Sequence, residues 1–281
     1  DDNIVVLPTD IYRAAKYNNI QKVLNWLGPP PVDKQRLNAK NPDRMEFSLV
    51  FGAVIGKNND FLSILLQLGA DVDPINATGA TPLSMCFAPG EYAQARLLLE
   101  WGAEISNNDL YASIDEFIEC ARMEGNTKLV NLMNSEYGGR RCEIINLSNR
   151  PDLIGKTCVV EKYLPSKGRY KVIFEVSKEV GLVGPENLKR RDRTPDDCGY
   201  YISYKNGRTN RHEFASKEEC QAFVASMKEE EKSEEDAAEA EARAEEAAAS
   251  LLAELDLDLS VDSENKRSKK GKEKGKKKGK K

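Results

Sequence analysis

Residues 69–83 read GADVDPINATGATPL, and this stretch carries the turn and capping residues that predict the fold of the N-terminal half. Gly69 follows a run of leucines, where a glycine suits the left-handed end of a helix. Gly79 suits a tight turn, and Thr81-Pro82 places a capping hydroxyl before a proline at the first helical position. The stretch therefore predicts a helix end, a short hairpin and the start of another helix.

The same signals return at a fixed distance along the chain. Gly69-Ala70-Asp71 is followed 33 residues later by Gly102-Ala103-Glu104, and 33 residues is the period of ankyrin repeats. The segments FSLVFGAV from Phe47 and TPLSMCFAPGEYAQARLLLEWGAE from Thr81 begin 34 residues apart, one more than this period, and the added residue is expected near Lys57-Asn58-Asn59. Residues 8–135 therefore resemble the ankyrin-repeat family, with about four repeats. The resemblance implies an all-α solenoid whose concave face binds a protein or peptide partner.

The implied concave face supplies the candidate partner-binding residues. They occupy inner-helix and hairpin positions of the expected repeats: Arg13, Lys16, Arg44, Phe51, Thr78 and Met85. For Phe51 and Met85, burial in the core is the alternative, because large apolar side chains are most often core residues.

The hydrophobic period changes from 3.6 to 2 after Gly138-Gly139-Arg140-Arg141. Short strands are expected at 143–147, 157–163, 169–176 and 180–183, with turn residues between them. Residues 138–194 therefore predict a small closed β-barrel, which is similar to SH3-like barrels. Three aromatic residues are candidates for a methyl-lysine cage, with barrel core as the alternative: Tyr163, Tyr170 and Phe174.

A hairpin followed by a helix is expected at 195–227. Asn206-Gly207 favours a type I′ turn between two strands, and Ser216 with Glu219 forms a capping box. Two strands and one helix have too little core to fold alone. We therefore expect this unit to pack on the barrel.

Cysteine and histidine content limits the chemistry. The six cysteines include no CxxC pair, so we expect buried reduced thiols and a cytoplasmic or nuclear location. His212 is the only histidine, which leaves no Ser-His-Asp or Cys-His system unless His212 itself serves. We expect no catalytic, cofactor or metal site.

Residues 228–281 form a charged tail. Residues 228–264 contain 15 acidic and 3 basic residues, whereas residues 265–281 contain 11 basic and 1 acidic. We expect an acidic helical or disordered segment followed by a Lys/Gly-rich one. The candidate contacts of the basic part with RNA or an acidic partner are Lys269, Lys270, Lys276, Lys277 and Lys278.

The sequence therefore predicts an α+β multidomain protein with units at 1–137, 138–194, 195–227 and 228–281. We expect a monomeric, non-enzymatic adaptor that does not enter membranes, since the longest apolar run, 47–55, is too short to span a bilayer. The alternative is a nucleic-acid- or ribosome-associated factor that contacts phosphates through the tail and through residues 189–193.

Overall fold

The computed structural model describes residues 5–104, 113–214, 216 and 218–227, and beyond them residues 229, 233, 237, 240, 241, 243–248 and 250. Residues Asp1–Lys228 form one compact unit and Glu229–Lys281 another. The described residues of the second unit are helical. The expected internal boundaries of the first unit, at 137/138 and 194/195, stay predictions.

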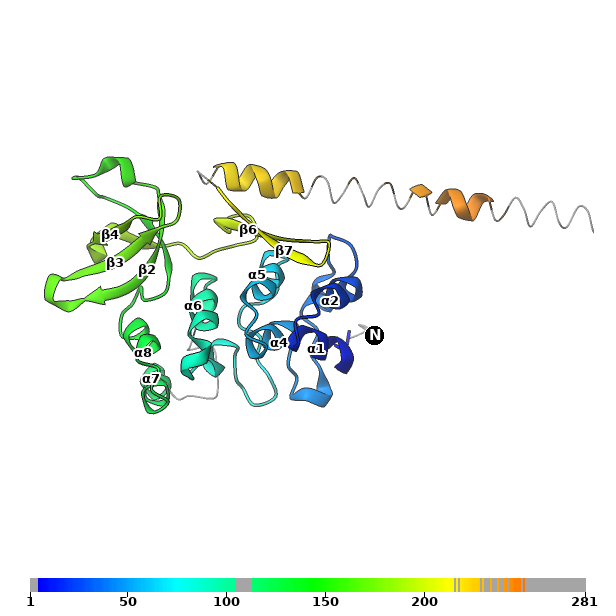
Figure 1. Ribbon diagram of the computed structural model, residues 1–281, viewed down its shortest axis with the longest axis horizontal. Coiled ribbons are helices and arrows are strands. Elements are labelled where there is room, and N and C mark those ends of the chain that lie inside the picture. Colours follow the sequence, from blue (N-terminus) through cyan, green and yellow to red (C-terminus); the bar gives the residue numbers. More distant parts are fainter. Residues whose placement is uncertain are drawn as a thin grey trace, which may run out of the picture. The chain divides into compact units, whose positions relative to one another are not determined.

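Helices build the N-terminal half of the first unit (Figure 1). Their bounds are α1 (Thr9–Lys16), α2 (Ile20–Leu27), α3 (Lys34–Leu37), α4 (Leu49–Ile55), α5 (Asn59–Gln67), α6 (Tyr92–Glu100), α7 (Ile114–Met123) and α8 (Thr127–Met133). Asparagine side chains cap three of them: Asn19 at α2, Asn58 at α5 and Asn126 at α8 each accept a bond from a backbone N–H of the first turn. The helices bury one continuous apolar core.

An antiparallel sheet follows α8. It contains β1 (Arg141–Ile144), β2 (Thr157–Leu164), β3 (Arg169–Phe174), β4 (Val180–Val183) and β5 (Leu188–Arg190), in the order β4-β3-β2-β1-β5. Alternation places one face inward, where Cys158 pairs with Phe174 and Val160 with Val172. Tyr170 and Phe174 are both 5% exposed, so they belong to the core of the sheet. This core position was the alternative to the aromatic cage.

The hairpin β6 (Tyr200–Lys205) and β7 (Arg208–Glu213) turns at Asn206 and Gly207, whose φ angles of 55° and 76° match the predicted turn. Ser216 Oγ accepts a bond from Glu219 N, which confirms the predicted helix cap. Ion pairs connect this unit with the sheet, but its described apolar side chains do not pack on the core of the sheet as expected. β6 lies instead along α5, and Tyr200 and Ile202 join the helical core (Figure 1).

The expected ankyrin solenoid is also wrong. The described chain forms helices and then a five-stranded and a two-stranded sheet, without a solenoid of equivalent repeats. Where the third repeat requires an inner helix, the chain makes only the three-residue turn η2 (Leu83–Met85), and the helical core continues into β6. The glycine caps themselves are present, since Gly69 and Gly102 have φ angles of 92° and 93°. Recurring cap chemistry ends helices locally and does not require a repeating fold.

The mixed α+β class is confirmed, with helices first and sheets after them. The closed SH3-like barrel is not confirmed, because strand pairing in the described part leaves β4 and β5 as the two edges of the sheet. Among the described residues, no helix combines the length and the apolar character needed to cross a membrane.

Candidate functional site

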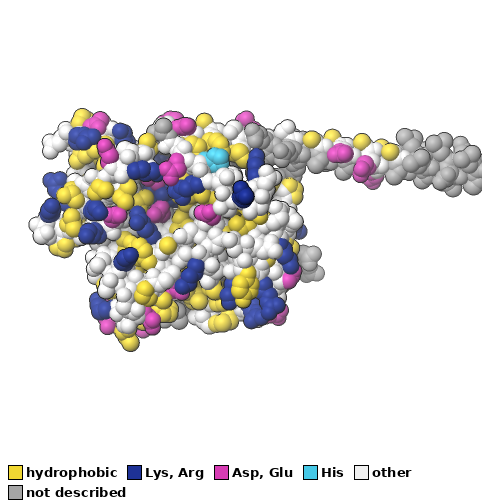
Figure 2. All heavy atoms as spheres, viewed as in Figure 1, with side chains coloured by type: hydrophobic (Ala, Val, Ile, Leu, Met, Phe, Trp, Pro, Cys, Tyr) yellow, Lys and Arg dark blue, Asp and Glu magenta, His cyan; other side chains and the backbone are white. Residues whose placement is uncertain are grey.

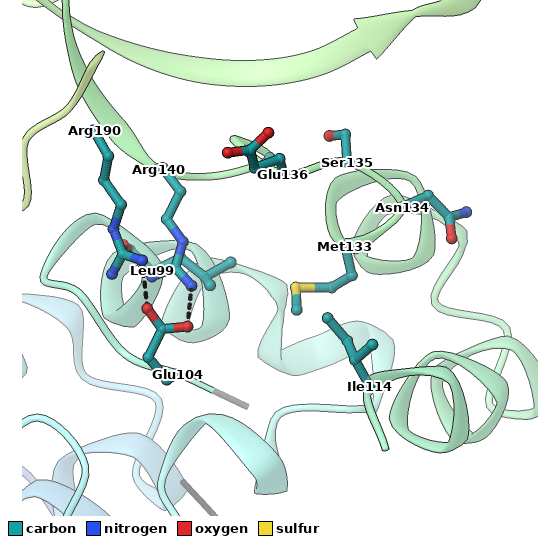
Figure 3. Close-up of a pocket in the computed structure, with 10 residues that line it drawn as sticks. Leu99, Glu104, Ile114, Met133, Asn134, Ser135, Glu136, Arg140 and Arg190 are labelled. Atoms are coloured by element: carbon teal, nitrogen blue, oxygen red, sulfur yellow. Dashed lines mark hydrogen bonds and ion pairs between the residues drawn. The ribbon is translucent and has the colours of Figure 1, made fainter. Parts of the chain in front are cut away.

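A cleft of about 430 Å³ opens where the helices meet the sheet (Figure 3). Its lining comes from the end of α6 and the residues after it, the start of α7, the end of α8, the link from α8 to β1, and β5. We call it the junction cleft. The lining residues used below are Leu99, Glu104, Ile114, Met133, Glu136, Arg140 and Arg190.

The floor of the junction cleft is apolar. Met133 is the last residue of α8 and Ile114 the first of α7, and their side chains approach each other in Figure 3. Leu99 is 1% exposed, whereas Ile114 is 45% exposed. Ser113 fixes the start of α7, because its Oγ accepts a bond from Glu116 N at 3.3 Å. The floor therefore combines a buried apolar side chain with one that is open to solvent.

Two arginines share one carboxylate at the rim of the cleft. Arg140 Nη2 donates to Glu104 Oε2 at 3.0 Å, and Arg190 Nη1 donates to Glu104 Oε1 (Figure 3). Arg140 Nη1 also donates to two carbonyls at the end of α6, Leu99 O at 3.3 Å and Ala103 O at 2.7 Å. A cation at a helix C-terminus stabilises the exposed carbonyls. The rim is thus held in place before any ligand arrives.

The rim of the cleft carries charged side chains of both signs. Burial lowers the pKa of Arg140 from its usual value, and Arg190 lowers it further, while Glu104 raises it. An arginine nevertheless stays protonated in a protein, so Arg140 supplies a fixed positive charge and no proton transfer. With Glu104 and Glu136 present beside Arg140 and Arg190, the cleft has charges of both signs.

Behind the rim, Arg193 links three parts of the chain. Its side chain is 4% exposed, and its Nη2 lies 2.8 Å from Glu100 of α6 and 2.5 Å from Glu175 after β3. Its guanidinium also lies 4.7 Å from the centre of the Tyr200 ring in β6. One buried cation therefore joins the helices, the sheet and the hairpin.

Arg141 and Arg191 extend this ion-pair network. Arg141, 1% exposed, pairs with Glu175 at 2.8 Å and Asp197 at 3.2 Å. Arg191 pairs with the other oxygen of Asp197 and with Glu143. Burial alone would raise the pKa of Glu175, but the charges of Arg193 and Arg141 outweigh it and hold that pKa below its usual value.

The six partner-binding residues expected from sequence lie outside the junction cleft. Arg13, Arg44 and Thr78 are exposed, and Lys16 and Met85 are half-buried. Phe51 is 0% exposed and stacks on Phe47 with ring centres 4.8 Å apart. It is therefore a core residue, which was the alternative to a partner-binding role. These residues were expected together on the concave face of a solenoid. Because the chain does not form that solenoid, the expected binding face is absent from the described part of the structure.

Sequence reasoning missed the residues that form the cleft. It used Arg140 only as a boundary marker and Arg190 only as a possible phosphate contact. The paired arginines after two glycines were the available signal, but nothing in the sequence connects them with Glu104, Ile114 or Met133. The tail lysines named above, at 269, 270, 276, 277 and 278, lie outside the described residues.

Other polar groups have structural roles. The six cysteines are free, and five are buried while Cys120 is half-buried, which confirms the expectation of buried thiols. His212 Nε2 lies 3.0 Å from Ser203 Oγ across the hairpin, and its ring packs on Phe223. Within the described part of the chain, no group of three or more His, Cys, Asp and Glu residues could hold a metal ion.

No protein-family model matches the chain, and no curated protein matches its sequence significantly. The resemblance to ankyrin repeats therefore lacks support from a family match as well as from the fold.

Proposed function

We propose that this protein is a non-enzymatic adaptor that holds a partner polypeptide in the junction cleft. The observation that carries the proposal is the apolar floor, with Ile114 45% exposed, inside a rim of prearranged charged side chains. Buried apolar centres with polar rims, enriched in Met and Arg, are typical of protein-binding surfaces. The cleft therefore suits an apolar side chain of the partner, flanked by polar groups.

The rim chemistry favours a polypeptide over a small anion. Arg140 and Arg190 already bind Glu104, and Arg190 Nε also binds Asp192 at 2.8 Å. A phosphate would have to displace these carboxylates. A peptide needs no such exchange, because hydrogen bonds at the rim of an interface can be made beside existing ion pairs.

The same pairing weakens the nucleic-acid alternative. Three of the cations in the segment 189–193 are bound to carboxylates: Arg190 to Glu104, Arg191 to Asp197 and Arg193 to Glu100. Such arginines are not free for phosphates. The tail lysines remain as the basis of that alternative, which stays a prediction.

A substitution in α7 tests the adaptor proposal. Ile114→Glu places a charge on the cleft floor, while a glutamate in the first turn of a helix is favourable for folding. Met123→Glu is the matched control, since Met123 ends the same helix, is 79% exposed and does not line the cleft. Proteins captured from nuclease-treated extract by the full-length chain should be lost with Ile114→Glu and kept with Met123→Glu.

Two results would contradict the proposal. Capture that is unchanged by Ile114→Glu would remove the cleft from partner binding. Capture that disappears on nuclease treatment of the unmodified protein would favour the nucleic-acid alternative instead.

A further inference from the structure

Strand β4 forms an open edge of the five-stranded sheet. Its sequence is Val-Gly-Leu-Val, with neither a charged residue nor a proline. Natural proteins usually protect sheet edges with charges, prolines or bulges, because an unprotected edge pairs readily with another strand. β4 has none of these within the strand itself.

The backbone of β4 presents hydrogen-bonding groups that point away from the sheet. Phe174 N donates to Glu179 O at 3.0 Å, so the backbone groups of Glu179, and of Gly181 two residues later, point toward β3. The residues between and after them point the other way, because the backbone groups of an antiparallel strand alternate in direction. Val180 and Leu182 therefore turn their N–H and C=O groups away from β3. Among the described side chains, Arg169 reaches Leu182 O, at the long distance of 3.5 Å.

The side chains beside this edge are apolar and basic. Val180 is 58% and Leu182 41% exposed. In the register of the sheet, Val180 lies opposite Ile173, Leu182 opposite Lys171, and Lys171 opposite Lys162. Apolar and basic residues therefore lie side by side on one face of the sheet.

Two cations of β3 lie next to β4. Lys171 lies opposite Leu182 and pairs with Glu161 at 2.6 Å, whereas Arg169 is exposed and has no ion pair among the described residues. Figure 2 shows dark blue Lys and Arg side chains among yellow apolar ones over the sheet. This composition complements an acidic and apolar ligand.

We propose that the β4 edge, defined as Val180–Val183 with Arg169 and Lys171 of the neighbouring strand β3 beside it, binds an extended acidic peptide of another polypeptide as a sixth strand. In the peptide, apolar and acidic residues alternate. The backbone groups of Val180 and Leu182 supply the main-chain bonds, and the peptide's carboxylates meet the cations. This surface goes beyond the junction cleft and does not depend on it.

A defined probe tests the proposal. The chain's own residues 254–259, ELDLDL, have this alternation, so a free labelled peptide with the sequence of residues 250–261 is the probe. Fluorescence anisotropy with the full-length protein should show saturable binding. Replacing both aspartates of the ELDLDL stretch with lysine in the peptide should abolish it, because the charges would then repel.

Protein variants locate the site. Arg169→Glu should weaken binding by roughly fivefold or more at low salt, whereas Lys156→Glu, an equal charge change at another exposed cation, should change it less than about twofold. Leu182→Pro removes the outward N–H and should abolish binding, with an unchanged circular-dichroism spectrum as its folding control.

Amide hydrogen exchange provides the direct readout. The amides of Val180 and Leu182 should become protected when the peptide binds, because each would then donate to the added strand. Absence of binding, equal weakening by Arg169→Glu and Lys156→Glu, or binding without protection of these two amides would each overturn the proposal.

Discussion

Arg193 is the residue on which the arrangement of helices, sheet and hairpin depends most directly. It is 5% exposed and pairs with Glu100 and Glu175. Removing one member of a buried ion pair leaves an uncompensated charge, which costs about 3–5 kcal/mol. We expect Arg193→Met to lower the free energy of unfolding by about that amount in urea titrations.

The control for this change is Arg150→Met. Arg150 pairs with Asp152 at 2.8 Å, but both side chains are more than half exposed, at 57% and 55%. Solvent screens such a pair, so no measurable loss of stability is expected. Equal effects of the two substitutions would contradict the structural role of Arg193.

Glu175 makes the free energy of unfolding depend on pH. Burial raises the pKa of Glu175, but the charges of Arg193 and Arg141 outweigh this effect and hold the pKa below its usual value. A carboxylate with a lowered folded pKa stabilises the fold fully above its unfolded pKa, about 4.3, and loses this contribution as pH falls through the folded pKa. Unfolding free energy should therefore fall below about pH 4.

Glu175→Gln tests this dependence. The variant should be less stable at pH 7 and should lose less further stability on acidification than the unmodified protein. The exposed neighbour Glu179, changed to Gln, should leave the pH profile of urea unfolding unaltered. A wild-type profile in the Glu175 variant would show that the ion pairs do not stabilise the fold.

At the scale of elements, Gln67 connects α5 with the hairpin. Its Nε2 donates to Ile202 O at 3.2 Å, and its Oε1 accepts from Ile202 N at 3.0 Å. The amide thus occupies the position of a neighbouring strand's peptide group beside β6. Gln67→Ala should leave both groups of Ile202 without their partner and speed hydrogen exchange at the Ile202 amide.

Gln21→Ala is the matched change on α2, where the side chain bonds to Asn25 and, among the described residues, not to the hairpin. It should leave exchange at Ile202 as it is. Unaltered exchange at Ile202 in Gln67→Ala would mean that the hairpin does not need α5.

The elements themselves were largely predictable from sequence. Strand β4 begins and ends where the periodicity predicted, and the Asn206-Gly207 turn is present, because turns and periods are local properties. The packing of the hairpin was not predictable in this way. Its contacts with α5 involve Ser63 with Tyr200 and Gln67 with Ile202, more than 130 residues apart, and side-chain type alone does not specify them.

At the scale of the whole molecule, the local nature of the sequence signals explains why the predicted ankyrin fold was wrong. Gly69 and Gly102 end helices in the same manner, yet this local agreement says nothing of what each helix packs against. The junction cleft joins Glu104 and Ile114 to Arg140 and Arg190 only through tertiary structure. Its arginines carried a charge signal in the sequence, but their carboxylate partners were invisible there.

The protein-binding role of the junction cleft is the central claim, and hydrogen exchange of the full-length chain with and without its captured partner tests it most directly. We expect the bound partner to slow amide exchange in residues 114–116 and 133–140, and Ile114→Glu to abolish this protection. Protection confined to residues 13–16, 44–51 and 78–85, or protection that persists in Ile114→Glu, would contradict the claim.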